Sequence, residues 1–292
     1  MQKFSLYMTR RFPFKLVIIS FLLLIFAGKS FGQPGPVNLH ENVSIRADFA
    51  QYFKQCGVEG SVVIYDDTKA MWIVSDTVDI KKETLPASTF KIINMLIALE
   101  TGAIADERHV VKWPGKTDTV KYGYRPEIYH DMTVKDAFKV SAGWAFVEIA
   151  KTIDRRLYRK YLEASGYGNV NLSENDTDFW NFGPMGISPL NQVQFLRKFY
   201  EGKLPFSKRN LEIVKGVMMT EQNPHYAIYS KTGWTMADQR NTGWWVGYLK
   251  KQRGVYFFAT RLLQDRRNNR DDFSACRKEI TKSILRDLKI IQ

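Results

Sequence analysis

The chain has 292 residues, of which 45% are hydrophobic, and it carries a formal net charge of +13. This content is sufficient for a full hydrophobic core and excludes an intrinsically disordered chain. A basic balance is compatible with nucleic-acid binding, but no zinc-finger, RNP-type or glycine-rich signature accompanies it. We therefore expect a solvated basic surface and no nucleic-acid partner.

The first 32 residues have the three parts of a secretory signal. Basic residues precede the apolar run LVIISFLLLIFAG (16–28), and small residues follow at Ser30 and Gly32. The run is too short for a comfortable membrane span, and an uncleaved anchor is the alternative. We expect cleavage after Gly32 and export to the periplasm. The mature protein would then have a charge of +8, because the leader removes five basic residues, and no stable membrane association.

Histidines and cysteines give little support for a metal site. The four histidines are scattered along the chain: His40, His109, His130 and His225. None forms an HExxH motif or a short pair with a carboxylate, so no metal is predicted. Cys56 and Cys276 could pair in an oxidising compartment, but the sequence does not place them within bonding distance.

Strand patterns occur at both ends of the expected mature chain. Two β-branched and aromatic runs, 61–66 and 70–75, flank a turn and predict a hairpin. Three further runs predict strands at 226–234, 242–250 and 255–263. These five strands indicate one antiparallel sheet assembled from both ends of the chain.

Helical periodicity fills the middle of the chain. It appears in four segments: 133–140, 145–153, 154–165 and 190–202. The C-terminal segment also places Ile280, Ile284 and Leu288 on one helical stripe, suited to packing on the sheet.

These elements predict a single α/β (α+β) domain over residues 33–292. An α/β lobe would comprise 33–84 and 225–292, and a helical lobe, 85–224, would be inserted into it. A crevice between the two lobes is the expected place for a site.

The segment LPASTFKIINMLIALETG (85–102) combines a serine and a lysine with an almost wholly apolar helix. Ser88 follows Pro86 at the expected helix N-terminus, where free N–H groups and the helix dipole favour negative charge. Lys91, three residues on, shares its face. Burial lowers a lysine pKa, and a neutral lysine can be a base or a nucleophile. An SxxK pattern is nevertheless common by chance, and a capping serine with a snorkelling lysine also produces it.

Further motifs follow in a fixed order: Ser141 in VSAGW, YGN at 167–169, Trp180 in DFW, and KTGW at 231–234. With PASTFK, this order resembles the class D (OXA-type) serine β-lactamases over essentially all of the mature chain. That family lies within the penicillin-binding protein and transpeptidase-like superfamily. Class A would require a glutamate in an ExxLN segment, where this chain has Ile187.

The resemblance implies hydrolysis of β-lactam antibiotics through an acyl-enzyme, with an antiparallel five-stranded sheet flanked by helices. Ser88 would be the nucleophile. Lys91 would take up carbon dioxide and, as a carbamate, act as general base for acylation and deacylation; no other cofactor is implied. Trp180 would hold the carbamate through its indole N–H. Ser141 would relay a proton to the β-lactam nitrogen, and Lys231 would supply positive potential there.

Substrate binding is implied for the KTGW segment and the last helix. The backbone N–H groups of Ser88 and Trp234 would form the oxyanion hole, next to Gly233. Thr232 and Arg277 would hold the substrate carboxylate. Four other arginines crowd the region of Arg277 and are open alternatives: Arg261, Arg266, Arg267 and Arg270.

One motif departs from the family. Class D enzymes usually show SxV, whereas this chain has Ser141, Ala142 and Gly143. The missing valine normally supplies part of the apolar wall around the lysine, so we expect less complete carboxylation. Tyr167 and Asn169 are interpreted as organising the site wall.

Two other classes of function stay open. A penicillin-binding or β-lactam-sensing domain would be acylated and stay so. A peptidoglycan carboxypeptidase or transpeptidase would use SxN at the second motif, which this chain lacks. The sequence predicts neither the preferred β-lactam nor the oligomeric state.

Overall fold

The computed structural model describes residues 42–237, 239–268 and 272–292. They belong to one compact unit, residues 33–292. The expected signal peptide lies outside the described residues. Within the described ranges, no helix combines the length and the apolar character that a membrane span needs.

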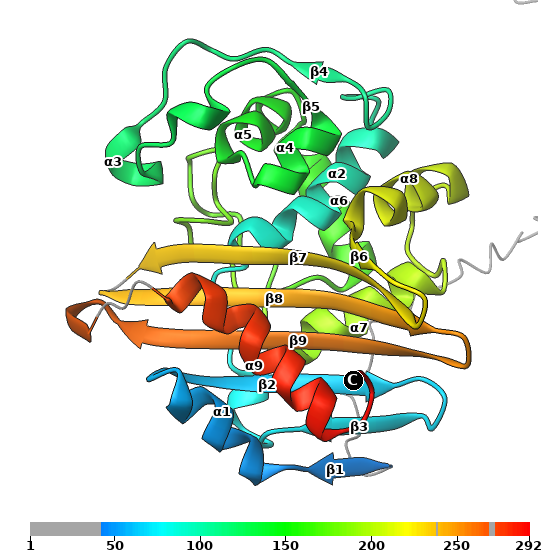
Figure 1. Ribbon diagram of the computed structural model, residues 1–292. Coiled ribbons are helices and arrows are strands. Elements are labelled where there is room, and N and C mark those ends of the chain that lie inside the picture. The colour runs from blue at the N-terminus through cyan, green and yellow to red at the C-terminus, as the bar shows by residue number, and fades with distance from the viewer. Residues whose placement is uncertain (1–41, 238, 269–271) are drawn as a thin grey trace, which may run out of the picture. The chain divides into compact units, whose positions relative to one another are not determined.

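A seven-stranded sheet forms the centre of this unit, in the order β1-β3-β2-β9-β8-β7-β6 (Figure 1). The strand bounds are Val43–Ile45 (β1), Glu59–Asp66 (β2), Met71–Val74 (β3), Met219–Gln222 (β6), Tyr226–Ala237 (β7), Arg240–Lys251 (β8) and Gly254–Asp265 (β9). A separate two-stranded sheet pairs Val110–Val111 (β4) with Met132–Thr133 (β5).

All five predicted strands are present, and their antiparallel pairing is confirmed, including the β2–β3 hairpin. The expected number of strands was too low, because β1 and β6 extend the sheet at its two edges. β1 pairs with β3 in parallel, and β6 pairs antiparallel with β7. β1 has only three residues, and β6, with the sequence MTEQ, lacks the β-branched and aromatic run that made the equally short β3 recognisable.

The α-helices are Ala50–Gln55 (α1), Lys91–Glu100 (α2), Thr119–Tyr122 (α3), Val134–Val140 (α4), Gly143–Lys151 (α5), Arg155–Ser165 (α6), Pro189–Tyr200 (α7), Lys208–Met218 (α8) and Phe273–Asp287 (α9). Short 3-10 turns cover Ala47–Phe49 (η1), Asp79–Lys81 (η2), Ala87–Phe90 (η3), Pro126–Ile128 (η4) and Arg266–Asn268 (η5). The four predicted helical segments are confirmed as α4, α5, α6 and α7.

The two faces of the sheet bury separate hydrophobic cores. Successive side chains of a strand point to opposite faces, so Val62 and Ile64 join the core that contains α9, while Val63 joins the core on the other face. α9 crosses one face of the sheet (Figure 1), where Ile280 and Ile284 are buried as the predicted stripe requires.

One helix of the segment 85–224 packs on the sheet and not only among helices. α7 contacts β2 and β9, and its buried residues belong to the same core as Val63. The other helices of this segment lie at one side of the sheet, beyond β7 (Figure 1). The strand β7 therefore borders the helical layer, and the candidate site lies along it.

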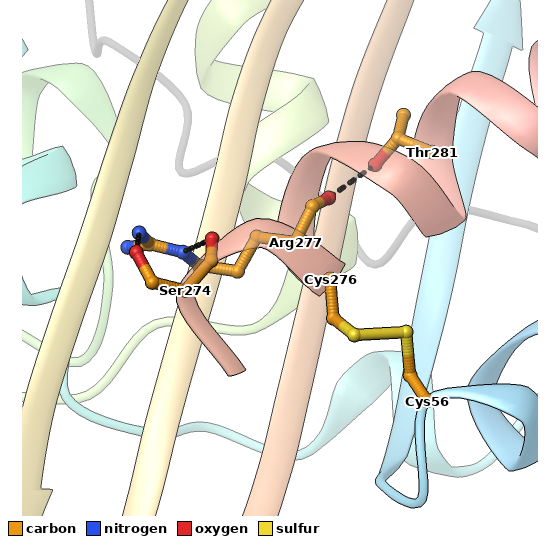
Figure 2. The surroundings of a disulfide bond; sticks show 5 residues. All are labelled: Cys56, Ser274, Cys276, Arg277 and Thr281. Carbon is orange, nitrogen blue, oxygen red and sulfur yellow. Dashed lines mark hydrogen bonds between the residues drawn. A yellow bond between two sulfur atoms is a disulfide. The ribbon is translucent and has the colours of Figure 1, made fainter. Parts of the chain in front are cut away.

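A disulfide bond joins Cys56, just after α1, to Cys276 in the first turn of α9 (Figure 2). The two Cα atoms are 6.1 Å apart, and the residues are separated by 220 positions in sequence. The pairing that the sequence left open is thus present. It attaches the beginning of α9 to the N-terminal part of the domain.

Candidate active site

The serine and lysine of the PASTFK segment meet at the junction of η3 and α2. Ser88 lies in the 3-10 turn η3, and Lys91 is the first residue of α2. The turn differs from the single helix that we expected, but the convergence is as predicted: Lys91 Nζ donates to Ser88 Oγ over 2.9 Å. Thr89 Oγ1 donates to the Pro86 carbonyl over 2.7 Å and so holds the turn from within.

Lys91 is completely buried, so the alternative of a snorkelling lysine is wrong. Its Nζ lies 5.2 Å from the centre of the Phe146 ring. Burial lowers the pKa of Lys91 to about 8; Asp178 opposes this shift and Arg125 adds to it. A substantial fraction of neutral amine is therefore available at mildly alkaline pH, next to the Ser88 hydroxyl.

Ser141 and Lys231 come together from segments far apart in the chain. Ser141 ends α4 in the left-handed conformation, with φ of 60°. Lys231 lies on β7, and its Nζ donates to Ser141 Oγ over 2.6 Å. Burial, with smaller contributions from Lys91 and Arg277, holds the pKa of Lys231 well below its usual value. This pair can pass a proton at the edge of the cavity.

Gly233 allows β7 to lie directly against η3. A Cβ atom at this position would be 3.1 Å from the Pro86 carbonyl oxygen and 3.3 Å from Ala87 Cβ, which is tighter than most such contacts. The absence of a side chain thus brings the neighbouring Thr232 and Trp234 to the same cavity as Ser88.

Arg277 extends from α9 (Figure 2), and it is one of the residues that line this cavity. Its Nη1 donates to the Gly233 carbonyl over 2.8 Å, and its Nε donates to the Ser274 carbonyl over 2.9 Å. Burial lowers the pKa of Arg277 to about 10, so the guanidinium is charged at neutral pH.

The other candidate arginines are placed differently. Arg261 is buried against Asp79, with a nitrogen to oxygen distance of 2.5 Å. Arg267 pairs with Asp265 and is 86% exposed. Arg270 lies outside the described residues. Arg266 is exposed, so Arg277 is the described candidate that lines the cavity; Arg125, which the sequence did not single out, also lines it.

The cavity that these elements enclose has a volume of about 510 Å³. The predicted site residues that line it are Ser88, Ser141, Thr232, Gly233, Trp234 and Arg277. Lys91 and Lys231 are buried behind its wall, in hydrogen-bond contact with the two serines. The structure thus assembles residues from η3, α4, β7 and α9 around one space.

Trp180 lies beneath η3. Its ring stacks on Phe90 with centres 5.0 Å apart, and its carbonyl accepts a hydrogen bond from Ala87 N over 3.1 Å. The indole nitrogen is buried and has no hydrogen-bond partner among the described residues. An unpaired buried N–H costs about 1–3 kcal/mol, so this position suits an acceptor supplied by another group.

Tyr167 and Asn169 support the site from behind. Tyr167 is buried, and its ring packs edge-on against Phe90 with centres 5.9 Å apart. Asn169 Oδ1 accepts a hydrogen bond from Gly186 N over 3.0 Å. Neither residue is among those that line the cavity.

Three connected residues at the cavity wall were missed in the sequence: Tyr122 and Asn181 line the cavity, and both bind Asp178. Asp178 is fully buried, and its carboxylate accepts hydrogen bonds from Tyr122 Oη at 2.6 Å and from Asn181 Nδ2 at 2.9 Å. Burial raises the pKa of Asp178 to about 6. An acidic residue two positions before Trp180, in the otherwise aromatic DFW segment, was the available signal.

Gly143 faces Tyr122. A Cβ atom on Gly143 would lie 3.6 Å from Tyr122 Cδ1, in ordinary van der Waals contact. The space that the missing valine leaves is therefore bordered by the ring whose hydroxyl binds Asp178. Phe146 lies beside Lys91.

One cluster of potential metal ligands occurs in the described ranges, and it comprises Cys56, Cys276 and Glu279. The two sulfur atoms are bonded to each other and cannot act as thiolates. This cluster therefore offers no competent metal site.

Comparison with known proteins agrees with this geometry. Residues 60–286 match the family model described as the penicillin-binding protein transpeptidase domain. The chain is similar to β-lactamase OXA-10 of Pseudomonas aeruginosa, with 40% identity over 225 residues, 76% of this chain and 81% of that protein. It is 37% identical to β-lactamase OXA-48 of Klebsiella pneumoniae over 251 residues, 86% of this chain and 90% of that protein.

Solved structures show the same similarity. A class D β-lactamase from Sebaldella termitidis has a TM-score of 0.80 and 35% identity, covering 86% of this chain and 98% of that one. A class D β-lactamase from Nostoc has a TM-score of 0.76 and 35% identity, with coverage of 82% and 98%.

Proposed function

The chain belongs to the class D serine β-lactamase family, and on this premise we propose that it hydrolyses β-lactam antibiotics through an acyl-enzyme on Ser88. The observation that carries the proposal is the contact of Lys91 Nζ with Ser88 Oγ at 2.9 Å, made by a lysine that is completely buried. A hydroxyl needs a base to become a nucleophile, and burial keeps part of the lysine population neutral and basic.

Acylation uses groups on two walls of the cavity. Ser88 Oγ attacks the β-lactam carbonyl, and the charge that develops on the carbonyl oxygen is stabilised by the backbone N–H groups of Ser88 and Trp234. Gly233 favours this arrangement, because a Cβ atom there would press on the Pro86 carbonyl oxygen at 3.1 Å. As the ring carbon–nitrogen bond breaks, Ser141 supplies a proton to the nitrogen, and Lys231 holds Ser141 in place over 2.6 Å.

Carbon dioxide, when it is bound to Lys91 as a carbamate, supplies an anionic general base for both acylation and deacylation. The residues present fit this group. Among the described residues, the indole N–H of Trp180 is buried without an acceptor, and burial lowers the pKa of Lys91 to about 8. We propose that Trp180 donates to the carbamate and that Lys91 is the carboxylated residue.

Substrate recognition rests on the β-lactam carboxylate. Thr232 and Arg277 line the cavity, and Arg277 retains N–H groups beyond those bound to Gly233 and Ser274. A guanidinium fork matches a carboxylate geometrically, so this residue binds the anionic end of the substrate.

Turnover of a chromogenic cephalosporin tests the function. We expect many substrate molecules to be hydrolysed per protein molecule, whereas a β-lactam sensor or a penicillin-binding transpeptidase would release about one equivalent of product and then stay acylated. Ser88→Ala should reduce hydrolysis by at least about 10³-fold with an unchanged circular dichroism spectrum. Ser173→Ala, at an exposed position, is the control.

Mass spectrometry identifies the acylated residue independently. With a slow substrate, the adduct should reside on the peptide that contains Ser88. An adduct on any other peptide would contradict the assignment of the nucleophile.

We also propose that the protein acts in the periplasm after removal of residues 1–32. The disulfide between Cys56 and Cys276 supports an oxidising compartment, where such bonds form and persist. N-terminal sequencing of the protein from a periplasmic fraction should begin at Gln33. A mature chain that starts at Met1 would indicate an uncleaved anchor.

A further inference from the structure

Three cationic side chains line the active-site cavity, and the proposed reaction uses only one of them. They are Lys121, Arg125 and Arg277. In the part of the chain that the structure describes, no aspartate or glutamate lines this cavity. Asp178 is buried behind the wall, where two residues that line the cavity bind its carboxylate. The cavity therefore presents more positive charge than a single substrate carboxylate requires.

The two unused cations come from a different side of the cavity than Arg277. Lys121 belongs to α3, and Arg125 immediately precedes η4. Arg277 belongs to α9 and donates to the Gly233 carbonyl on β7. Figure 1 shows α3 among the helices beyond β7, whereas α9 crosses the face of the sheet. The cavity thus has one cation on the side of the sheet and two on the helical side.

Arg125 is anchored next to Ser141. Its Nη2 donates to the Val140 carbonyl over 3.2 Å, and Val140 immediately precedes Ser141. Its Nε donates to the exposed carboxylate of Glu127 over 2.9 Å, and an exposed ion pair of this kind contributes little. A guanidinium has five N–H groups, so these two bonds leave three without a partner among the described residues. Arg125 can therefore bind an anion in the cavity.

The charge of Arg125 also acts on the two buried lysines of the site. Burial is the main cause of the lowered pKa of Lys91 and of Lys231, and Arg125 lowers the pKa of both further. Arg277 acts on Lys231 in the same direction. Arg125 is thus within electrostatic range of the groups that act on the substrate.

Lys121 adds charge and an aromatic surface to the same wall. Its Nζ lies 4.5 Å from the centre of the Phe182 ring and 5.7 Å from the centre of the Tyr122 ring. The two rings meet edge to face with centres 5.5 Å apart, and both line the cavity. Lys121 also pairs at 2.5 Å with Asp176, an exposed residue that does not line the cavity. Aromatic rings beside a cation suit an aryl group that carries an acid.

The shape of a penicillin connects the two sides of the cavity. Its ring carboxylate and its acylamino side chain are attached at opposite ends of the fused ring system. In the proposed reaction, the ring carboxylate binds Arg277 while the β-lactam carbonyl lies at Ser88. The acylamino side chain then extends away from Arg277, toward the wall that contains Lys121 and Arg125.

We propose that Arg125, supported by Lys121, forms a second anion site, which selects β-lactams whose acylamino side chain carries a carboxylate or a sulfonate. The inference rests on the proposed hydrolysis of β-lactams and names the substrate class that the same cavity prefers. Arg125 is a specificity residue in this arrangement, because it binds the side chain of the substrate and takes no part in breaking the ring.

Three penicillins that differ only at the α carbon of the side chain test the inference. Benzylpenicillin carries a hydrogen there, carbenicillin a carboxylate, and ampicillin an amino group that is protonated at about pH 6.5. At this pH and at low ionic strength, with bicarbonate present, we expect the wild-type kcat/KM to be highest for carbenicillin and lowest for ampicillin. Added sodium chloride should reduce these differences, because it screens exposed charges.

Arg125→Gln should lower kcat/KM for carbenicillin about 5- to 20-fold relative to benzylpenicillin, since a partly exposed charged hydrogen bond is lost. The ratio is the readout, because a general disturbance of Ser141 would change both values together. Arg125→Lys keeps the charge and should retain part of the preference. Arg108→Gln is the matched control and should leave the ratio unchanged. Arg108 is an exposed arginine that pairs with an acid two positions away, as Arg125 does, and it does not line the cavity.

Arg277→Ala separates the two anion sites. It should lower kcat/KM for all three penicillins by a similar factor, since each carries the ring carboxylate. A similar loss for all three in Arg125→Gln would show that Arg125 binds the ring carboxylate, and an unchanged ratio would show that it binds no side-chain acid. Either result, or a wild-type kcat/KM for ampicillin above that for carbenicillin, would overturn the inference and leave hydrolysis intact. If the wild type hydrolyses none of the three, the proposed function itself is wrong.

Discussion

The guanidinium of Arg277 donates a hydrogen bond to the carbonyl of Gly233 over 2.8 Å. This bond ties the first half of α9 to the strand that borders Ser88. Since the adjacent residue, Cys276, is bonded to Cys56, α9 is held at the site by a hydrogen bond and to the N-terminal part of the domain by a covalent bond (Figure 2).

Replacement of Arg277 should weaken substrate binding selectively. We expect Arg277→Ala to lower kcat/KM for a penicillin by about 10- to 100-fold, because a charged hydrogen bond to the carboxylate is lost. Steady-state kinetics with the free acid and with the methyl ester of the same penicillin provide the measurement. The substitution should lower kcat/KM for the acid and leave kcat/KM for the ester unchanged. Arg267→Ala, at an exposed arginine, is the control. Equal losses for acid and ester would show that Arg277 acts only on the structure of β7.

Trp180→Phe should slow deacylation more than acylation. The ring can still stack on Phe90, but the indole N–H that would hold the carbamate is removed. Pre-steady-state kinetics should show a burst followed by a slow steady rate. Trp245→Phe is a matched control. The indole nitrogen of Trp245 is also buried without a partner in the part of the chain that the structure describes, but it belongs to the core on the other face of the sheet. Equal loss in both steps would indicate a packing role for Trp180.

Added bicarbonate should raise the rate of the wild-type enzyme if the space that Gly143 leaves beside Tyr122 admits water to Lys91 and so opposes carboxylation. Gly143→Val should reduce this dependence. Its Cβ would meet Tyr122 in ordinary contact, but the two methyl groups extend further, so Gly143→Ala serves as a second variant. Rates that do not respond to bicarbonate would show that the valine is dispensable here.

The rate at which carbon dioxide restores activity to the decarboxylated enzyme should depend on pH through the protonation of Lys91. After removal of carbon dioxide, reactivation at a fixed dissolved carbon dioxide concentration requires the neutral amine. Since the pKa of Lys91 is lowered to about 8, the reactivation rate should rise about tenfold per pH unit below pH 8 and level off above it. A rate that continues to rise to pH 10 would mean that burial does not lower this pKa.

Reduction of the disulfide should destabilise the domain. Removing a constraint that closes a long loop costs about 2–4 kcal/mol, which for a domain of this size lowers Tm by roughly 4–16 °C. Thermal unfolding of the wild type with and without a reductant gives the measurement. The double variant Cys56→Ala, Cys276→Ala should show the lower Tm in both conditions, and a reductant effect on this variant would point to another cause.

Local patterns in the sequence were sufficient for much of the fold. The five predicted strands and helices α4 to α7 follow from side-chain periodicity and composition, because backbone sterics and the burial of one face act over a few residues at a time. The contact of Ser88 with Lys91 is of the same kind, since three positions along a helical turn bring two side chains together. The short edge strands β1 and β6 carry no such pattern, and the sequence missed them.

Contacts between distant segments were decided only by the tertiary structure. Lys231 meets Ser141 across 90 positions, Tyr122 meets Asp178 across 56, and Cys56 meets Cys276 across 220. The family motifs indicated the first pair, whereas no local rule connects the other two. Whether a buried acid such as Asp178 is ionised depends on which donors and cations surround it, and that is determined by the packing of separate elements against one another.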